Sequence, residues 1–262
     1  MSLKIFKVDS FTNKKFAGNP AAVCFLEKEA DEQWMQNIAR EMNLSETAFL
    51  LQHRNGYNIR WFTPTVEVAL CGHATLASAH VLYETGNVSP AEKIVFHSQS
   101  GYLHAQKQGD WIELDFPATN EEPATYLPQI AAALGVTATY VGINKFDYII
   151  EVESEKILRE LKPDFQMLRS LEVRGIIVTT KSETPGFDFI SRFFAPGAGI
   201  DEDPVTGSAH CCLTPYWSKK LGKTDFTAYQ ASERGGVLRL SLKGDRVLLG
   251  GQAVTILRGE LA

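Results

Sequence analysis

The sequence predicts an α+β fold of two pseudo-symmetric lobes, each a curved mixed β-sheet wrapped around a central apolar helix. Two observations lead to this expectation. Short runs rich in Val, Ile, Phe and Tyr alternate with a few helical segments, and the second half of the chain repeats features of the first. At roughly 150 residues per domain, the 262 residues form one large domain or two small ones.

In the first half, apolar runs with β-branched and aromatic residues predict strands at 5–11, 21–26, 47–52, 57–62, 93–97, 102–106 and 111–116. Residues 31–41 predict a helix with Asp31 as N-cap and with Trp34, Ile38 and Met42 on one face. Residues 72–83 predict a second helix, which ends before Gly86, the residue type that favours a left-handed cap. This helix is apolar nearly all round, so it is expected to be buried on all sides.

The second half consists of the same kinds of apolar and helical segments. Strands are expected at 139–143, 148–152, 174–180, 187–194, 237–242 and 247–257, and helices at 127–134 and 209–221.

The two halves share motifs at a nearly constant spacing. GYL at 101–103 and GDWIEL at 109–114 return 135 residues later as GVL and GDRVLL, and the same spacing carries Gly72 onto Gly207. RWFTP at 60–64 returns 132 residues later as RFFAP. A duplication is therefore predicted, with a first lobe at 1–120 and a second at 121–262, and with C-terminal residues packing back on the first lobe. Ligands favour a cleft between such lobes, which we expect to face each other about a pseudo-twofold axis.

Charge and composition exclude several classes of protein. Lys and Arg number 26 against 31 Asp and Glu, a net charge of −5 without a basic stripe, which argues against nucleic acid or an acidic membrane as partner. The longest weakly charged stretch, 68–82, is shorter than the ~20 residues that span a bilayer, and no signal-peptide pattern is present. We expect a cytoplasmic protein with four reduced thiols: Cys24, Cys71, Cys211 and Cys212.

The starts of the two central helices are candidate anion sites, because free backbone N–H groups point out of a helix N-terminus. Under the 135-residue spacing, Cys71 lies on Thr206 and His73 on Ser208. Two such starts would hold a carboxylate or phosphate without any Arg or Lys. In the alternative interpretation, the glycines only let each helix approach its sheet, and His73 and Ser208 are caps.

Two carboxylates are candidates for proton chemistry. Asp203 ends an acidic segment directly before the second helix, where it either caps the helix dipole or orients or relays a proton. Glu46 lies at the mouth of an apolar strand, where partial desolvation favours general acid/base work; the alternative is a turn residue paired with solvent or Arg40. No metal is expected, because ligand spacings are missing and the adjacent residues 210–212 would point in different directions on a helix and pack in the core.

Five segments together resemble the phenazine-biosynthesis PhzF-like isomerase family: FAGNPAAV (16–23), NLSET (43–47), RWFTP (60–64), CGHAT (71–75) and EDPVTGSA (202–209). The resemblance covers nearly the whole chain and implies the diaminopimelate-epimerase-like fold. It also implies a homodimer that works without cofactor or metal on a small anionic metabolite. The catalytic residues it implies are Glu46, His73 and Asp203, and the substrate-binding residues are Asn19, Gly72, Gly207 and Ser208.

The expected reaction is a proton shift, with Glu46 removing a proton from one carbon and returning it to another on the same face, as in the family's isomerisation of a dihydro-hydroxyanthranilate. Related epimerases use one cysteine per lobe. Here the residue at the duplicate position of Cys71 is Thr206, which disfavours a racemase with two thiols. Two alternatives stay open: a one-base epimerase or racemase of amino or hydroxy acids with Cys71 as second proton carrier, and a non-catalytic carboxylate-binding protein.

Overall fold

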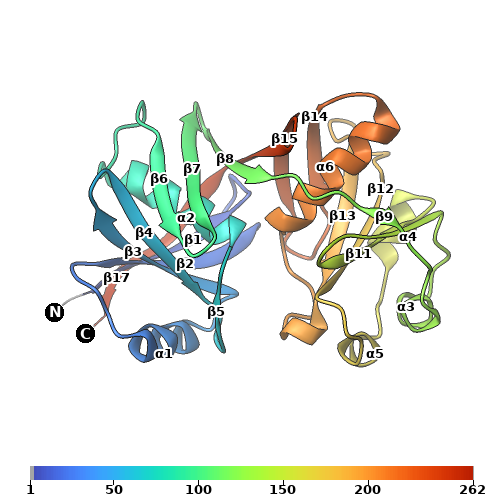
Figure 1. Ribbon diagram of the computed structural model, residues 1–262, viewed down its shortest axis with the longest axis horizontal. Helices are drawn as coiled ribbons and strands as arrows, with labels where there is room; N and C mark the ends of the chain where they lie inside the picture. The colour runs from blue at the N-terminus through green and yellow to red at the C-terminus, as the bar shows by residue number, and fades with distance from the viewer. Residues whose placement is uncertain (1–2, 262) are drawn as a thin grey trace. The chain divides into compact units, whose positions relative to one another are not determined.

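The computed structural model describes residues 3–261 and separates into two compact units (Figure 1). Unit 1 consists of Met1–Phe116 and Leu248–Ala262, and unit 2 of Pro117–Val247. The predicted boundary near residue 120 counts the last residues with the second lobe in sequence but packs them back on the first, and their contacts group them with unit 1. The physical reason is that β17 (Ala253–Leu261) pairs antiparallel with β1 (Leu3–Ser10).

Unit 1 is a mixed sheet that curves around α2 (Gly72–Glu84). β2 (Asn19–Leu26) pairs antiparallel with β1 and parallel with β3 (Glu46–His53), which pairs antiparallel with β4 (Gly56–Phe62). β4 then runs parallel to β6 (Ile94–Ser98), and β7 (Gly101–Gln108) and β8 (Trp111–Pro117) follow as antiparallel neighbours. The short β5 (Glu67–Val68) pairs with β4.

The predicted burial of the second helix is confirmed. α2 packs against β1, β2, β3 and β17, and nearly every residue from His73 to Tyr83 is buried. Small side chains make this possible, since Ala74, Ala77 and Ala79 let the strands approach closely. Gly86 follows the helix with φ of 74°, the left-handed conformation expected of it.

The helix α1 (Glu32–Met42) covers the outside of the same sheet. Asp31 accepts a hydrogen bond from the Trp34 N–H at 3.0 Å and is the N-cap, as predicted. The predicted apolar face is shifted by one residue, because Met35 and Ala39 are the buried residues and Trp34 is 42% exposed.

Unit 2 repeats this order of strands around α6 (Gly207–Leu221). β10 (Tyr140–Ile143), β11 (Asp147–Glu151), β12 (Gly175–Lys181) and β13 (Phe189–Phe194) pair antiparallel, parallel and antiparallel in turn. β13 continues parallel to β14 (Asp225–Gln230), which pairs antiparallel with β15 (Gly236–Lys243). The unit also contains β9 (Glu122–Pro123), the start of β16 (Arg246–Gly251) and four short helical segments: α3 (Pro128–Leu134), α4 (Glu155–Glu160), α5 (Phe165–Arg169) and the 3₁₀ turn η1 (Pro196–Ala198).

The duplication extends to side chains. The Arg60 guanidinium binds Glu67 with an Nε to Oε1 distance of 2.7 Å, and Arg192 binds Glu202 with the same distance. The last strand of each sequence repeat pairs with the first strand of the other repeat. β9 follows β8 and pairs with β10, and β17 follows β16 and pairs with β1.

Several elements differ from the sequence-based expectation. The short β5, β9 and η1 were not expected, and neither were β14, α4 and α5, whose residues are half polar. The single strand expected at 247–257 is two strands, β16 and β17, separated at Gln252. Across residues 3–261, the helices are all too short or too polar to span a membrane.

Candidate active site

Glu46 and His73, distant in sequence, meet at one end of unit 1. Glu46 is the first residue of β3 and His73 the second residue of α2. The Glu46 Oε2 atom lies 3.1 Å from His73 Nε2, and the two side chains are only 13% and 6% exposed. The structure therefore brings these two predicted residues into direct contact.

The loop before β2 positions the opposite edge of the imidazole. Asn19, fully buried at the start of β2, lies with its amide Nδ2 3.2 Å from His73 Nδ1, and the Ser10 hydroxyl donates to the His73 carbonyl at 2.8 Å. Gly18 makes this approach possible, since it has φ of 66° and a Cβ there would lie 2.1 Å from the Ser10 carbonyl oxygen. Asn19 thus holds the ring of His73.

Cys71 is the third side chain at this place. It is the N-cap of α2, and its Sγ lies 3.5 Å from His73 Nδ1. Burial raises the pKa of Cys71 to about 11, so it is a neutral thiol near neutral pH. Burial opposes the charged form of His73, but the Glu46 carboxylate 3.1 Å away favours it, and the pKa of His73 is held well above its ordinary value. The carboxylate of Glu46 is the anionic neighbour that favours the imidazolium.

The contact between Glu46 and His73 leaves bonding capacity unused. The Glu46 Oε2 and His73 Nε2 atoms are buried and, within residues 3–261, have no partner with hydrogen-bond geometry. Buried polar atoms in native proteins nearly always have a partner, so this pair is available to a ligand. The Cys71 side chain makes no capping hydrogen bond in the described part of the chain, which leaves the N–H groups at the start of α2 to other acceptors.

In unit 2, the corresponding network is built differently. Thr206 is the N-cap of α6, as the 135-residue spacing predicts, and its hydroxyl donates to Asp203 Oδ2 at 2.5 Å. The Gln230 side chain accepts from the Thr206 N–H at 2.9 Å and donates to the Asp203 carbonyl at 2.7 Å. Asp203 is 9% exposed, so the structure places it beside the start of α6 together with Gly207 and Ser208.

Arg174 is a residue that the sequence analysis missed. Its Nη2 donates to the Ser208 hydroxyl at 3.3 Å, and its Nε donates to Asp147 Oδ1 at 2.8 Å. Arg174 therefore places a cation beside the start of α6, while the expectation that the helix starts hold an anion without Arg or Lys stays a prediction. Asp147, which is 1% exposed, holds the Arg174 guanidinium in place. The signal in the sequence that could have indicated Arg174 is VRG at 173–175, directly before a buried apolar strand.

The strand registers identify the residue of unit 2 that corresponds to Glu46. Thr47 pairs with Phe62 in unit 1, and Ile176 pairs with Phe194, the duplicate of Phe62, in unit 2. The position of Glu46 therefore corresponds to Gly175. A Cβ at Gly175 would lie 2.3 Å from the Phe193 ring and 3.1 Å from Asp147 Oδ1, so a side chain does not fit there.

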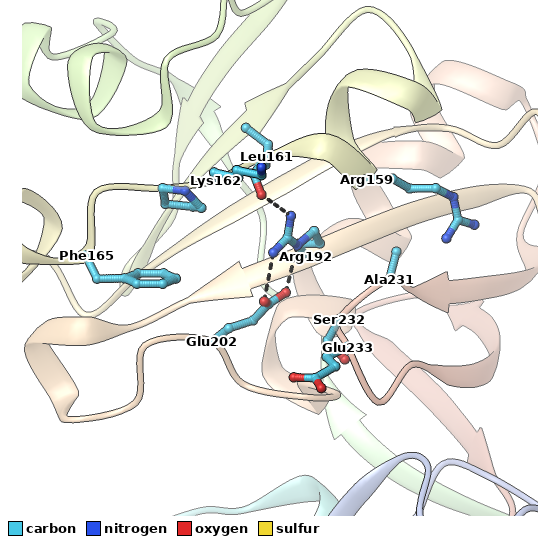
Figure 2. A pocket seen from close by; sticks show the side chains of 10 residues that line it. Arg159, Leu161, Lys162, Phe165, Arg192, Glu202, Ala231, Ser232 and Glu233 are labelled. Carbon is cyan, nitrogen blue, oxygen red and sulfur yellow. Dashed lines mark hydrogen bonds and ion pairs between the residues drawn. The ribbon is translucent and has the colours of Figure 1, made fainter.

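A pocket of about 560 Å³ lies elsewhere in unit 2 (Figure 2). Its centre is Arg192, whose guanidinium is neutralised by Glu202 and also donates to the Leu161 carbonyl at 2.8 Å. This ion pair duplicates the scaffold pair of unit 1, and the pocket is lined by none of the predicted site residues. We interpret it as a feature of the scaffold.

The expected core role of residues 210–212 is confirmed. His210, Cys211 and Cys212 are all buried, and the His210 ring lies 2.8 Å from the Thr206 carbonyl through Nδ1 and stacks on Phe189. Burial lowers the pKa of His210 to about 4 and raises the pKa values of the two thiols to about 12. These side chains are thus neutral near neutral pH.

Comparisons with known proteins agree on one family and one fold. The family model described as "Phenazine biosynthesis-like protein" matches residues 8–259. An uncharacterized isomerase of Halalkalibacterium halodurans is 56% identical over 262 residues, covering 100% of this chain and 99% of the relative. A PhzF family protein of Enterococcus faecalis has a TM-score of 0.96 at 44% identity, with 100% of both chains covered. A predicted epimerase of Pseudomonas aeruginosa, at 22% identity with 98% of each chain covered and a TM-score of 0.79, shares the fold.

Proposed function

This chain belongs to the phenazine biosynthesis-like protein family, and from that premise we propose that it is a cofactor-independent isomerase that shifts a proton on a small carboxylate-bearing substrate. The isomerase class itself is supported by the relatives. The finer assignment depends on one observation. Glu46 and His73 form a buried pair in unit 1, whereas the duplicate position of Glu46 is Gly175 in unit 2.

Glu46 is the general base in this proposal. Its carboxylate Oε2 takes a proton from an acidic carbon of the substrate and returns it to a second carbon, since the same group is then a carboxylic acid beside the substrate. A single base works on a single face, so the shift is suprafacial. His73, whose Nδ1 faces the Asn19 amide, donates from Nε2 to a substrate oxygen as charge develops there.

The carboxylate of the substrate is held by backbone N–H groups in this proposal. The start of α2 supplies them around Gly72 and His73, because no side-chain cap from Cys71 occupies them. For Asp203, Gly207 and Ser208, a role in binding or catalysis stays a prediction, and the cation Arg174 beside Ser208 adds a second group of suitable charge.

Deuterium exchange tests the proposal. Full-length protein treated with EDTA is incubated in D₂O with small unsaturated carboxylic acids chosen by thermal-shift screening, and label at each carbon is followed by NMR. The expected result is a product with the double bond moved and with incomplete deuterium at the accepting carbon, since Glu46 carries part of the original hydrogen. Glu46→Gln is expected to slow turnover by roughly 10²–10⁴-fold. Glu41→Gln, an exposed carboxylate on α1, is the control and should keep full turnover.

The two alternatives give different results in the same assay. A one-base epimerase with Cys71 as second carrier exchanges and inverts one carbon without moving a double bond, and Cys71→Ser abolishes its activity. A non-catalytic binding protein shows saturable binding without label at any ligand carbon. Full turnover by Glu46→Gln would contradict the proposed mechanism.

A further inference from the structure

Three side chains with metal-ligating atoms converge at the start of α2. One ligand atom each of Glu46, Cys71 and His73 lies within 4.8 Å of the other two. Cys71 and His73 are 6% and 5% exposed, so the three atoms are confined by the packing of β3 against α2.

The separations are close to those of a coordination sphere. Zinc lies about 2.0–2.3 Å from nitrogen, oxygen and sulfur ligands, which places two ligands of a tetrahedron roughly 3.3–3.8 Å apart. The Cys71 Sγ to His73 Nδ1 distance is 3.5 Å, and the Glu46 Oε2 to His73 Nε2 distance is 3.1 Å. The two contacts involve opposite ring nitrogens, and one ion can bind only one of them. The second anionic side chain must therefore turn toward that nitrogen, and since the three ligand atoms lie within 4.8 Å of one another, this movement is short.

The kinds of ligand atom select the kind of metal. A thiolate, an imidazole and a carboxylate suit Zn²⁺ or Co²⁺, whereas Mg²⁺ and Ca²⁺ require oxygen ligands. Three protein ligands leave a fourth position open to water or to a substrate carboxylate. In the described residues, Glu46 Oε2 and His73 Nε2 form no hydrogen bond of good geometry beyond their 3.1 Å ion pair, so a bound cation would replace one contact only.

We propose that Glu46, Cys71 and His73 bind one Zn²⁺-like divalent cation, and that the bound metal inhibits the isomerase by occupying its base. On binding, the Cys71 S–H bond and the N–H bond of the coordinating His73 nitrogen break, both protons pass to solvent, and metal–sulfur, metal–nitrogen and metal–carboxylate bonds form without any change of oxidation state. The inhibitory part of this inference depends on the proposed function of Glu46, whereas the binding part does not.

Cobalt absorption tests the binding directly. Tag-free, EDTA-treated full-length protein is titrated with Co²⁺, and we expect saturation at one equivalent with a thiolate-to-cobalt charge-transfer band that one equivalent of Zn²⁺ removes. Cys71→Ser should abolish the band, and Glu46→Gln should weaken Co²⁺ binding at least about tenfold. Cys211→Ser is the matched control, because Cys211 is also 6% exposed near the start of a central helix, and it should keep the band.

Circular dichroism of each variant verifies that it is folded. A wild-type protein without the band, a band that survives in Cys71→Ser, or a band lost in Cys211→Ser would overturn the metal site. The spectrum requires no substrate, so its result is independent of the D₂O assay. If both the cobalt band and turnover are found, Zn²⁺ should reduce deuterium exchange by the wild-type protein at the concentration at which it displaces Co²⁺. Deuterium exchange that persists in the Zn²⁺-loaded protein would overturn the proposed inhibition.

Discussion

Acid should destabilise this protein through one buried histidine of the α6 core. The ring of His210 is fully buried, and its pKa is lowered from 6.5 to about 4 by burial. Between these two pH values the unfolded chain binds a proton that the folded chain does not, so the free energy of unfolding falls as the pH falls. Each pH unit corresponds to about 1.4 kcal/mol, which gives about 3 kcal/mol over the whole window.

The substitution His210→Gln removes this dependence while keeping a donor for the Thr206 carbonyl, which lies 2.8 Å from Nδ1 in the wild type. Urea unfolding at pH 7.0, 6.0 and 5.0, followed by tryptophan fluorescence, compares the two proteins. Trp217 is a suitable reporter because it stacks on Phe189, which also stacks on His210. The wild type is expected to lose about 2 kcal/mol more than the variant between pH 7.0 and 5.0. Parallel losses in both proteins would refute the reasoning.

Three further substitutions test how the scaffold is held. Gly18→Ala places a side chain at a left-handed φ and against the Ser10 carbonyl, whereas Gly109→Ala places one at a left-handed φ in open space. The loss in free energy of unfolding for Gly18→Ala should therefore exceed the roughly 1–2 kcal/mol expected for Gly109→Ala. Equal melting temperatures of the two variants would contradict this. Arg174→Gln leaves the buried Asp147 without its cation and should cost about 2–3 kcal/mol in urea unfolding, below the full value for a buried pair because Arg174 is 41% exposed. Glu155→Gln leaves one acceptor oxygen for the donors that the two carboxylate oxygens of Glu155 now share, two backbone N–H groups, Arg159 and the Thr184 hydroxyl, and should destabilise the protein by roughly 1–3 kcal/mol at pH 7. Its cost should shrink as the pH falls toward 2, because burial of Glu155 is outweighed by its hydrogen bonds, which lower its pKa to about 2.

Elements with a strong apolar pattern could be predicted from the sequence. The N-cap Asp31, the buried α2 and its end before Gly86 depend on local chemistry, and the structure has all three. The repeat of GYL and GDWIEL likewise predicted matching elements, and β7 and β15 begin at the two glycines. β14 was missed because polar and apolar residues are mixed in its sequence. It is a strand because it pairs with β13 on one side and with β15 on the other, and these pairings cannot be predicted from its own residues.

The site was only partly predictable for a related reason. Glu46 and His73 could be named from their motifs, but their 3.1 Å contact depends on the packing of α2 against β3. Arg174 was missed because its role depends on Asp147 and Ser208, which are 27 and 34 residues away in sequence. Residues whose meaning depends on long-range partners carry little local signal in one sequence.

The two copies have kept their scaffold and changed their chemistry. The ion pairs of Arg60 and Arg192 are the same in both units, as are the starting positions of the central helices. At the position of the proposed base, however, unit 1 has Glu46 and unit 2 has Gly175, whose missing side chain leaves room for Phe193 and Asp147.

That exchange has a chemical consequence. A two-base epimerase needs a proton carrier in each copy, one for each face of the reacting carbon. Unit 2 has no carboxylate at the duplicate position, and instead Asp147 presents the cation of Arg174 to Ser208 beside it. A cation at this place stabilises an anion but does not accept a proton, because the guanidinium stays protonated. Unit 2 also has Thr206 at the duplicate position of Cys71, where related epimerases carry a cysteine. The divergence of the copies therefore supports the proposal that Glu46 is the single base.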